Sequence, residues 1–490
     1  MQVLKKVGVI IIFFALAACT TAGSPGDRIS LVESANIATD NFGQATNFRV
    51  GMLLPLTGPA SKQGQGLRNA ALMALEDVKN PNMLLQFYDT RSSANGAKAA
   101  VESAIRQNTQ LIIGPLTGDE VKSISERVIK KRIPVVTFST NTDALRPGIF
   151  SLGLLVNEQV DRIMTYAVDR GRTKFALLVP DNGTGISVAR AAIISAQKNE
   201  AAITGIAFYP PDTSDFSEAL KGLTDYDKRS ERVNKIRNNL MAKASAGNDA
   251  AAKILARLKK IDTLGDVDFD AIIIPEHGTK LKSAAAMLGY YDVTSPKVKI
   301  LGTSIWENSS LNNESNIIGS WYPVLSRKHN AYFINKYTKI FGEAPNSIYA
   351  FGYDAVALAS ALTNTNRSDL ELSITSPDGY IGINGAFKVF ANGTNKHSLD
   401  ILEVKRDGDA VVNPADKSFS MSRGYNLREI IIDEDYQAPK IFGKDKALAQ
   451  SLIYGGQLPR YEMTTYYDPE AGTEEEIVRD ALAKHKIVIP

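Results

Sequence analysis

The side chains that most often carry out catalysis are few and scattered in this 490-residue sequence. Its four histidines are His277, His329, His397 and His485. No zinc-protease motif, nucleophile elbow or glycine-rich phosphate loop occurs in the sequence. Asp266-Val-Asp-Phe-Asp270 alternates as in a calcium loop, but it lacks the spacing and the bidentate glutamate of such a site. We therefore expect a non-enzymatic protein that uses no cofactor and no metal.

The single cysteine, Cys19, indicates lipid attachment. Two lysines precede an apolar run, 7–16, which is too short to span a membrane and has the length of a signal-peptide core. Leu16-Ala17-Ala18-Cys19 resembles the bacterial lipobox, which implies a signal peptide over 1–18 and acyl chains on Cys19. Thr20 then implies the outer membrane, on the periplasmic face of the cell envelope. The alternative is an ordinary secretory peptide with an incidental cysteine.

The composition is that of a globular protein, with 44% hydrophobic and 22% charged residues. The formal net charge is +3, and the two lysines of the signal peptide contribute to it, so nothing indicates nucleic-acid binding. At roughly 150 residues per domain, the length suggests about three structural units. Residues 19–47 are mostly small and polar and predict a flexible tether between the membrane and the folded part.

From residue 48 onward, short apolar runs alternate with helical patterns. The predicted strands are 48–55, 84–88, 111–114, 134–138, 175–179, 203–209, 269–274 and 299–302. The predicted helices are 66–79, 94–107, 119–131, 185–200 and 279–289. Nearly continuous apolar strands that alternate with helices predict an α/β fold with parallel sheets covered on both faces. In such sheets, ligand-binding groups lie in loops at the carboxyl ends of the strands.

Several segments carry a resemblance to a known family. They are Pro55–Gly64, Arg68–Asp77, Ile112–Pro115, Ile133–Val136 and Tyr353–Ala359. These segments are similar to type I periplasmic binding proteins, in particular to the leucine, isoleucine and valine receptors. Over about residues 48–419, the resemblance implies two Rossmann-like lobes with parallel sheets around a cleft. The implied boundaries are 48–153 with 327–365 for lobe 1, and 154–326 with 366–419 for lobe 2.

A narrower resemblance covers Leu301–Trp306, Gly319–Pro323 and Asp378–Gly385. These segments are similar to alphaproteobacterial lipoproteins that activate penicillin-binding proteins. The similarity implies a periplasmic lipoprotein that binds a peptidoglycan synthase and stabilises its active state. The alternative is the substrate-binding lipoprotein of an ABC importer for amino acids or small amides. A cell-wall enzyme is a third hypothesis.

Matching the family's loops onto this sequence places small residues along the lobe 1 side of the cleft. The residues expected to bind a ligand there are Thr57, Ser61, Thr117, Gly118, Ser139 and Thr140. Hydroxyl groups, and the N–H groups at helix N-termini, suit a carboxylate or another anion. The same residue types end strands and cap helices in proteins generally, so the alternative is a structural role.

The lobe 2 side is less favourable for an amino-acid ligand. Amino-acid receptors carry an acid just after the first crossing between the lobes, where this sequence has Leu152–Asn157. A ligand ammonium that faced leucine would lose its hydration without gaining a partner. Asp181 or Glu276 could replace that acid, and Trp306 could form an aromatic wall. The departure favours protein recognition, with a small polar ligand in the cleft as an additional hypothesis.

Two further segments depart from the receptor pattern. Residues 226–263 predict a helical hairpin insert with an excess of basic side chains. These are Lys228, Arg229, Arg232, Lys235, Arg237, Lys243, Lys253, Arg257, Lys259 and Lys260. They could contact an acidic partner or lipid headgroups, or simply solvate a helical decoration. The C-terminal extension, 420–490, predicts helices near 444–454 and from a capping box at 473–476.

Overall fold

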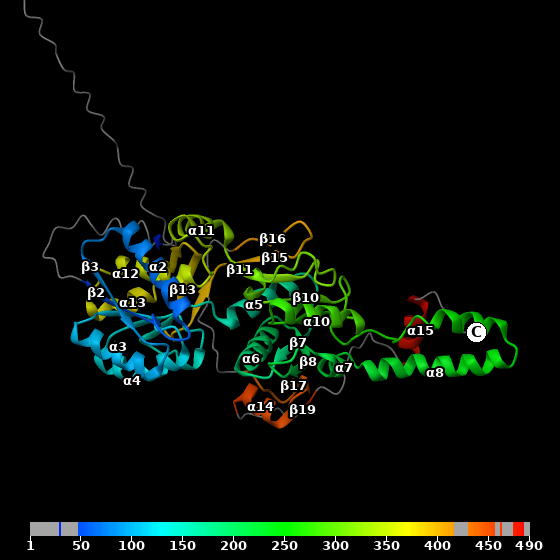
Figure 1. Cartoon of the computed structure of the whole chain (residues 1–490). Coiled ribbons are helices and arrows are strands. Elements are labelled where there is room, and N and C mark those ends of the chain that lie inside the picture. The colour runs from blue at the N-terminus through cyan, green and yellow to red at the C-terminus, as the bar shows by residue number, and fades with distance from the viewer. Residues whose placement is uncertain (1–28, 31–47, 416–429, 456–460, 463–473, 485–490) are drawn as a thin grey trace, which may run out of the picture.

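The computed structural model describes residues 29–30, 48–415, 430–455, 461–462 and 474–484. The predicted signal peptide, the lipidation residue Cys19 and most of the predicted tether lie outside the described residues. In the described part, two α/β lobes lie next to each other and a helical arm projects from the second lobe (Figure 1).

Lobe 1 is built on a parallel sheet, which in the described residues has five strands in the order β3-β2-β4-β5-β6. These strands are β2 (Phe48–Leu54), β3 (Met83–Asp89), β4 (Leu111–Ile113), β5 (Val135–Thr137) and β6 (Ile149–Ser151). Helices cover both faces because the strands carry apolar side chains on both sides. They are α2 (Ser61–Val78), α11 (Arg327–Phe341) and α12 (Tyr349–Ala361) on one face, and α3 (Ala94–Arg106) and α4 (Gly118–Lys131) on the other.

A smaller sheet completes lobe 1. Its described strands follow the order β1-β12-β13-β14. They are β1 (Ile29–Ser30), β12 (Tyr380–Gly382), β13 (Gly385–Val389) and β14 (Asn395–His397). The short helices η2 (Thr142–Ala144), η4 (Arg367–Asp369) and α13 (Leu370–Ile374) also belong to this lobe. Leu370, Tyr380 and Phe387 join the same buried core as the side chains of α2 and α12.

Lobe 2 contains a larger mixed sheet. In the described residues it has eight strands in the order β16-β15-β11-β10-β9-β7-β8-β18. They are β7 (Lys174–Pro180), β8 (Ala202–Tyr209), β9 (Ala271–Ile273), β10 (Lys299–Leu301), β11 (Trp321–Leu325), β15 (Leu399–Glu403), β16 (Ala410–Asn413) and β18 (Lys440–Phe442). In the order of the sheet, the strands β11, β10, β9, β7, β8 and β18 pair in parallel. The β11–β15 and β15–β16 pairs are antiparallel. The accompanying helices are α5 (Val156–Val168), α6 (Gly183–Lys198), α7 (Ser217–Leu223), α10 (Gly278–Tyr290) and η3 (Ser304–Asn308).

The chain passes between the lobes at residues 152–155, at Ser326 and at Ser398. The last of these crossings differs from our expectation, which returned the chain to lobe 2 at residue 366. Residues 370–389 instead pack into the lobe 1 core. Helical and strand periodicity show that a segment has a buried face, but they do not show which of two similar sheets receives it.

The insert and the C-terminal extension interact with lobe 2 and with each other. The insert forms an antiparallel pair, α8 (Tyr226–Ser245) and α9 (Asp249–Leu258), and α15 (Glu474–Lys484) packs against it to form the arm (Figure 1). Earlier in the extension, β18 adds to the edge of the sheet beside β8, and α14 (Lys446–Tyr454) packs on α6. A short strand pair, β17 (Gln437–Ala438) with β19 (Tyr461–Glu462), lies nearby. The predicted two-lobed α/β fold with parallel sheets is confirmed.

Candidate functional site

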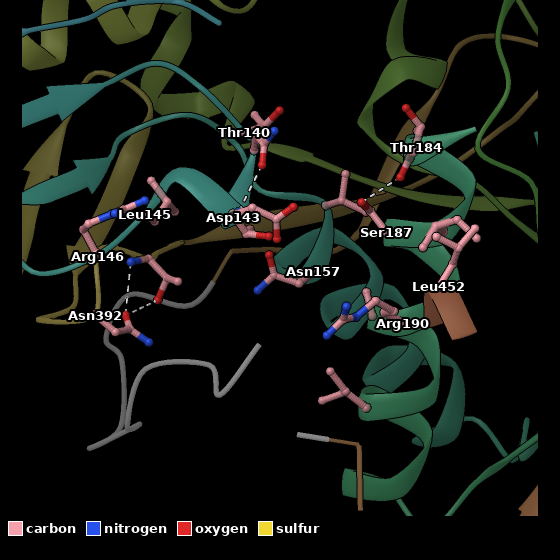
Figure 2. Close-up of a pocket in the computed structure, with 18 of the residues that line it drawn as sticks. Thr140, Asp143, Leu145, Arg146, Asn157, Thr184, Ser187, Arg190, Asn392 and Leu452 are labelled. Carbon is pink, nitrogen blue, oxygen red and sulfur yellow. Dashed lines mark hydrogen bonds between the residues drawn. The ribbon is translucent and has the colours of Figure 1, made fainter. Parts of the chain in front are cut away.

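A groove of about 900 Å³ lies between the two lobes (Figure 2). Lobe 1 contributes residues 140–147, which follow β5 and include η2, together with two residues of the β13–β14 turn. Lobe 2 contributes the start of α5 and one face of α6. Leu452 of α14 also lines the groove, so the C-terminal extension forms part of its wall.

Asn157, the second residue of α5, is the most informative side chain in the groove. Asn157 is only 9% exposed, yet neither the nitrogen nor the oxygen of its side-chain amide has a hydrogen-bond partner among the described residues. The side chains of the next two residues are hydrogen-bonded: Glu158 accepts from Leu155 N at 2.8 Å, and Gln159 Oε1 accepts from Ser304 N at 2.9 Å. Buried polar groups are nearly always hydrogen-bonded, so an unpaired amide on a residue that lines a groove makes Asn157 a candidate for ligand binding.

Charged side chains from both lobes line the same groove. Asp143 and Arg146 come from lobe 1, and Arg190 comes from α6 of lobe 2. Figure 2 shows Asn157 in the space between Asp143 and Arg190. Asp143 belongs to η2, where its backbone N donates to the side chain of the N-cap residue Asn141 at 3.0 Å. The Asp143 residue itself is exposed. Among the described lining residues Asp143 is the one acid, and it suits a ligand ammonium group. Arg146 of lobe 1 and Arg190 of lobe 2 suit a ligand carboxylate.

The hydroxyl residues predicted in lobe 1 mostly have intramolecular partners. The hydroxyl of Thr57 donates to Asp89 at 2.7 Å, and Thr117 forms a capping box with Glu120 at the start of α4. Ser139 is buried, and its Oγ accepts from Asn141 N at 3.1 Å. Ser61 and Gly118 are the first residues of α2 and α4. Of the predicted set, Thr140 is the residue that lines the groove in the described structure.

The three residues predicted in lobe 2 are not among those that line the groove. Asp181 forms an ion pair with Lys444 of the C-terminal extension. Glu276 is buried and accepts from the hydroxyl of Tyr209 at 2.7 Å, and burial together with this contact raises the pKa of Tyr209. Trp306 is 1% exposed, and its Nε1 donates to Ile274 O at 3.0 Å. These contacts give each side chain a structural role, and a role in ligand binding stays a prediction.

Sequence reasoning did not identify Asn157, Asp143 or Arg190 as candidates. Asp143 gave the clearest signal, since it lies three residues after the predicted Thr140 and follows the predicted strand 134–138. Arg190 resembles any exposed arginine on an amphipathic helix. Asn157 lies at the end of the stretch that was considered only for its missing acid.

Some of the basic side chains of the arm make contacts within the protein. Arg229 is buried and donates to Gly265 O and Thr263 Oγ1, both at 3.0 Å, and to Asp292 at 2.9 Å. Burial lowers the pKa of Arg229 from its ordinary value, and the charge of Asp292 opposes that shift. Arg237 donates to Leu258 O at 2.9 Å at the end of α9. Exposed basic side chains remain on the outer surface of the arm at Lys253, Lys259 and Lys260.

The described residues contain neither a membrane-spanning helix nor a cluster of metal-ligating side chains. No described helix combines the length and the apolar character needed to cross a bilayer. No group of three or more histidine, cysteine, aspartate or glutamate residues in the described part is arranged to hold a metal ion.

This architecture is similar to that of known proteins. Residues 47–225 match the model of the family described as "Periplasmic binding protein". A curated relative, an uncharacterized protein from Rickettsia prowazekii (strain Madrid E), is 26% identical over 129 residues, which cover 26% of this chain and 34% of the relative. The chain therefore spans about a third of the length of that relative.

Solved structures show the same fold over about three quarters of the chain. A protein assigned as a branched-chain amino acid ABC transporter from Rhodospirillum rubrum is similar with a TM-score of 0.60 and 16% identity, covering 74% of this chain and 99% of that one. An ABC transporter substrate-binding protein from Sphaerobacter thermophilus has a TM-score of 0.56 and 17% identity, with coverage of 75% and 98%.

A solute-binding protein of an ABC transporter from Rhodopseudomonas palustris BisB5, solved with 3,4-dihydroxybenzoic acid, has a TM-score of 0.52 and 16% identity, with coverage of 77% of this chain and 98% of that one. At these identities the similarity concerns the fold alone. With the family match over residues 47–225 and two parallel-sheet lobes around a groove, the chain has the type I periplasmic-binding-protein fold.

Proposed function

We propose that this protein is the solute-binding component of an ABC importer and that it holds a small polar solute in the groove between its lobes. The observation that carries the proposal is the buried, unpaired amide of Asn157 at the lobe 2 side of that groove. The solute-binding proteins from Sphaerobacter thermophilus and Rhodopseudomonas palustris, which share this fold, support the same assignment. A lipid on Cys19 would keep such a receptor near its membrane partner.

The charges of the groove suit an amino acid or a small amide. Arg146 and Arg190 can bind a carboxylate, and Asp143 can neutralise an ammonium group. The acid that the sequence lacks after the first crossing is thus supplied from the opposite lobe. The missing acid was one of the reasons for our preference for protein recognition, and Asp143 weakens that reason.

The mechanism follows from the position of these groups on both lobes. A solute that contacts Asp143 of lobe 1 and Asn157 of lobe 2 gains its full set of contacts only when the lobes approach each other. It therefore stabilises a closed conformation and shifts the population toward it. The permease would recognise that closed form.

Thermal unfolding of the full-length protein with a panel of L-amino acids, their amides and short peptides tests this proposal. A true ligand at 100 times its Kd should stabilise the protein by about 2.7 kcal/mol. Asn157→Leu should lose that stabilisation, whereas Asn234→Leu, an exposed change on α8, should keep it. The absence of stabilisation by every compound of the panel would contradict the proposal.

Activation of a peptidoglycan synthase is the second candidate, and one observation favours it. The arm formed by α8, α9 and α15 projects from lobe 2 and presents Lys253, Lys259 and Lys260 to solvent (Figure 1). In a pull-down of peptidoglycan synthases, Lys253→Glu with Lys260→Glu should abolish binding if the arm recognises an acidic partner. Lys122→Glu with Lys130→Glu on α4 of lobe 1 is the matched control. Unchanged binding in the arm variant would exclude this role for the arm.

A further inference from the structure

The amide of Asn157 restricts the chemistry of its partner more than a single charge would. It offers two N–H donors on Nδ2 and an acceptor on Oδ1, and none of these is used within the described residues. A carboxylate only accepts, so it would leave Oδ1 unpaired, and an ammonium only donates, so it would leave Nδ2 unpaired. An extended peptide residue satisfies both atoms at once, because its own N–H and C=O point to the same side of the chain, so its C=O accepts from Nδ2 while its N–H donates to Oδ1.

The groove is also larger than a single amino acid requires. Its volume of about 900 Å³ lies near the upper end of the roughly 300–1,000 Å³ typical of sites for drug-sized ligands. Apolar side chains form one side of it, namely Val156, Ile186, Ile194 and Leu452. The ligand should therefore combine an amide with apolar substituents.

Through Leu452, the C-terminal extension forms part of the apolar lining of the groove. Leu452 lies on α14, which packs against α6, and it is 44% exposed where it lines the groove. Leu448, one helical turn earlier on α14, is 52% exposed but does not line the groove. This pair separates contact with the groove from the general effect of an exposed leucine on the same helix.

We infer that the groove binds a short peptide rather than a free amino acid, with the N–H and C=O of one peptide residue paired to Asn157 and an apolar side chain against Leu452. The inference rests on the proposed function, in that the groove must hold a solute. Asp143 and Arg190 then lie where they can contact the charged ends of the peptide.

Calorimetric titration of the full-length protein with defined probes tests the inference. The probes are L-leucine, alanyl-alanyl-leucine, and the analogue of that tripeptide in which the bond between the two alanines is an ester. We expect the tripeptide to bind at least about tenfold more tightly than leucine or the ester, because the ester lacks the N–H that Oδ1 needs. Asn157→Ala should bind tripeptide and ester equally. Leu452→Ala should weaken tripeptide binding, and Leu448→Ala should not.

The outcomes separate this inference from the proposed function. Binding of leucine without preference for the tripeptide would overturn the inference and leave the solute receptor intact. Equal binding of tripeptide and ester by the unaltered protein would overturn the pairing with Asn157, even if the Asn157 variant failed to fold. If none of the probes bound and the amino-acid panel also failed to stabilise the protein, both proposals would be overturned.

Discussion

Nδ1 of His397 lies 3.0 Å from Oε1 of Glu158, and both side chains are 1% exposed. Glu158 belongs to α5, directly after the first crossing between the lobes, and His397 ends β14, directly before the last crossing. Oε2 of Glu158 also accepts from His397 N at 2.6 Å. This contact therefore joins two of the segments about which the lobes would rotate.

Replacing His397 by leucine should destabilise the fold. The change removes the imidazole hydrogen bond to the buried Glu158 side chain, which keeps its contacts with Leu155 N and His397 N, and the loss of one partner of a buried polar group typically costs about 1–3 kcal/mol. Urea denaturation measures the difference. His277→Ala is the control, since the His277 side chain is 72% exposed and should change stability by no more than about 0.5 kcal/mol. Equal effects of the two variants would show that the Glu158–His397 contact contributes nothing specific.

Replacing Asn157 by leucine should stabilise the unliganded protein while it removes ligand binding. The leucine buries no unpaired polar atoms, and an unsatisfied buried group costs about 1–3 kcal/mol. Thermal unfolding without ligand gives the first quantity and calorimetry gives the second. Such opposite effects are typical of binding sites, where function requires a locally unfavourable arrangement. A loss of stability would show that the amide has a partner within the protein.

Asp354 should make stability depend on pH. Burial raises the pKa of Asp354 to about 7, although Ile383 N donates to it at 2.8 Å. The unfolded carboxyl has a pKa of about 3.9, so between about pH 4 and pH 7 the folded state holds a proton that the unfolded state lacks. The contribution of this group is therefore fully present at low pH and is lost as the pH rises through about 7.

Comparison with Asp354→Asn isolates that contribution. Relative to the variant, the unaltered protein should lose a few kcal/mol of stability between about pH 4.5 and pH 7.5, since each pKa unit corresponds to about 1.4 kcal/mol. Urea titrations at several pH values measure the two curves. Parallel curves would mean that the carboxyl of Asp354 has an ordinary pKa.

Gly443→Ala should detach the extension from lobe 2. Gly443 has a φ of +71°, and a Cβ there would lie 2.0 Å from the backbone oxygen of Phe208 on β8. The clash would displace β18 and the neighbouring Lys444, which binds Asp181. Limited proteolysis should then cut residues 430–455 faster. Gly455→Ala shares the positive φ, at +64°, but its Cβ would meet nothing within 4 Å, so it controls for backbone strain alone. Equal cleavage of the two variants would contradict the prediction.

Arg229→Ala should loosen the arm at its base. The variant removes the guanidinium hydrogen bonds to Gly265 O, Thr263 Oγ1 and Asp292, and each such hydrogen bond contributes about 0.5–1.5 kcal/mol, or more where a charged group takes part. Hydrogen exchange within α8 and α9 should become faster, while exchange in the lobe 1 sheet stays the same. The exposed neighbour Lys228, changed to alanine, is the control and should leave exchange unaltered.

Much of the fold could be predicted because its strands are almost entirely apolar. The predicted strand 175–179 corresponds to β7 (Lys174–Pro180), and the predicted strand 203–209 corresponds to β8 (Ala202–Tyr209). The spacing of Val233 and Leu240 likewise indicated a buried face on α8, and both side chains are buried in the arm. Such patterns are local, and packing against any apolar neighbour satisfies them.

The candidate site was harder to predict because it depends on contacts between distant segments. Asp181 looked like a ligand-binding acid, but its partner Lys444 lies 263 residues away along the chain. Trp306 looked like an aromatic wall, but the β10 region buries it. The importance of Asn157 comes from the lack of a partner in a buried position, which no residue type or spacing reveals.

The crossings between the lobes have a consequence for synthesis on the ribosome. The lobe 1 core combines side chains from Phe48–Leu152 with side chains from Leu325–Leu399, so it cannot be complete until almost 400 residues have emerged. The strands β7, β8, β9 and β10, which form the centre of lobe 2, are all available by residue 301. We therefore expect the lobe that begins later in the sequence to assemble earlier during translation, with the first half of lobe 1 waiting for its missing helices.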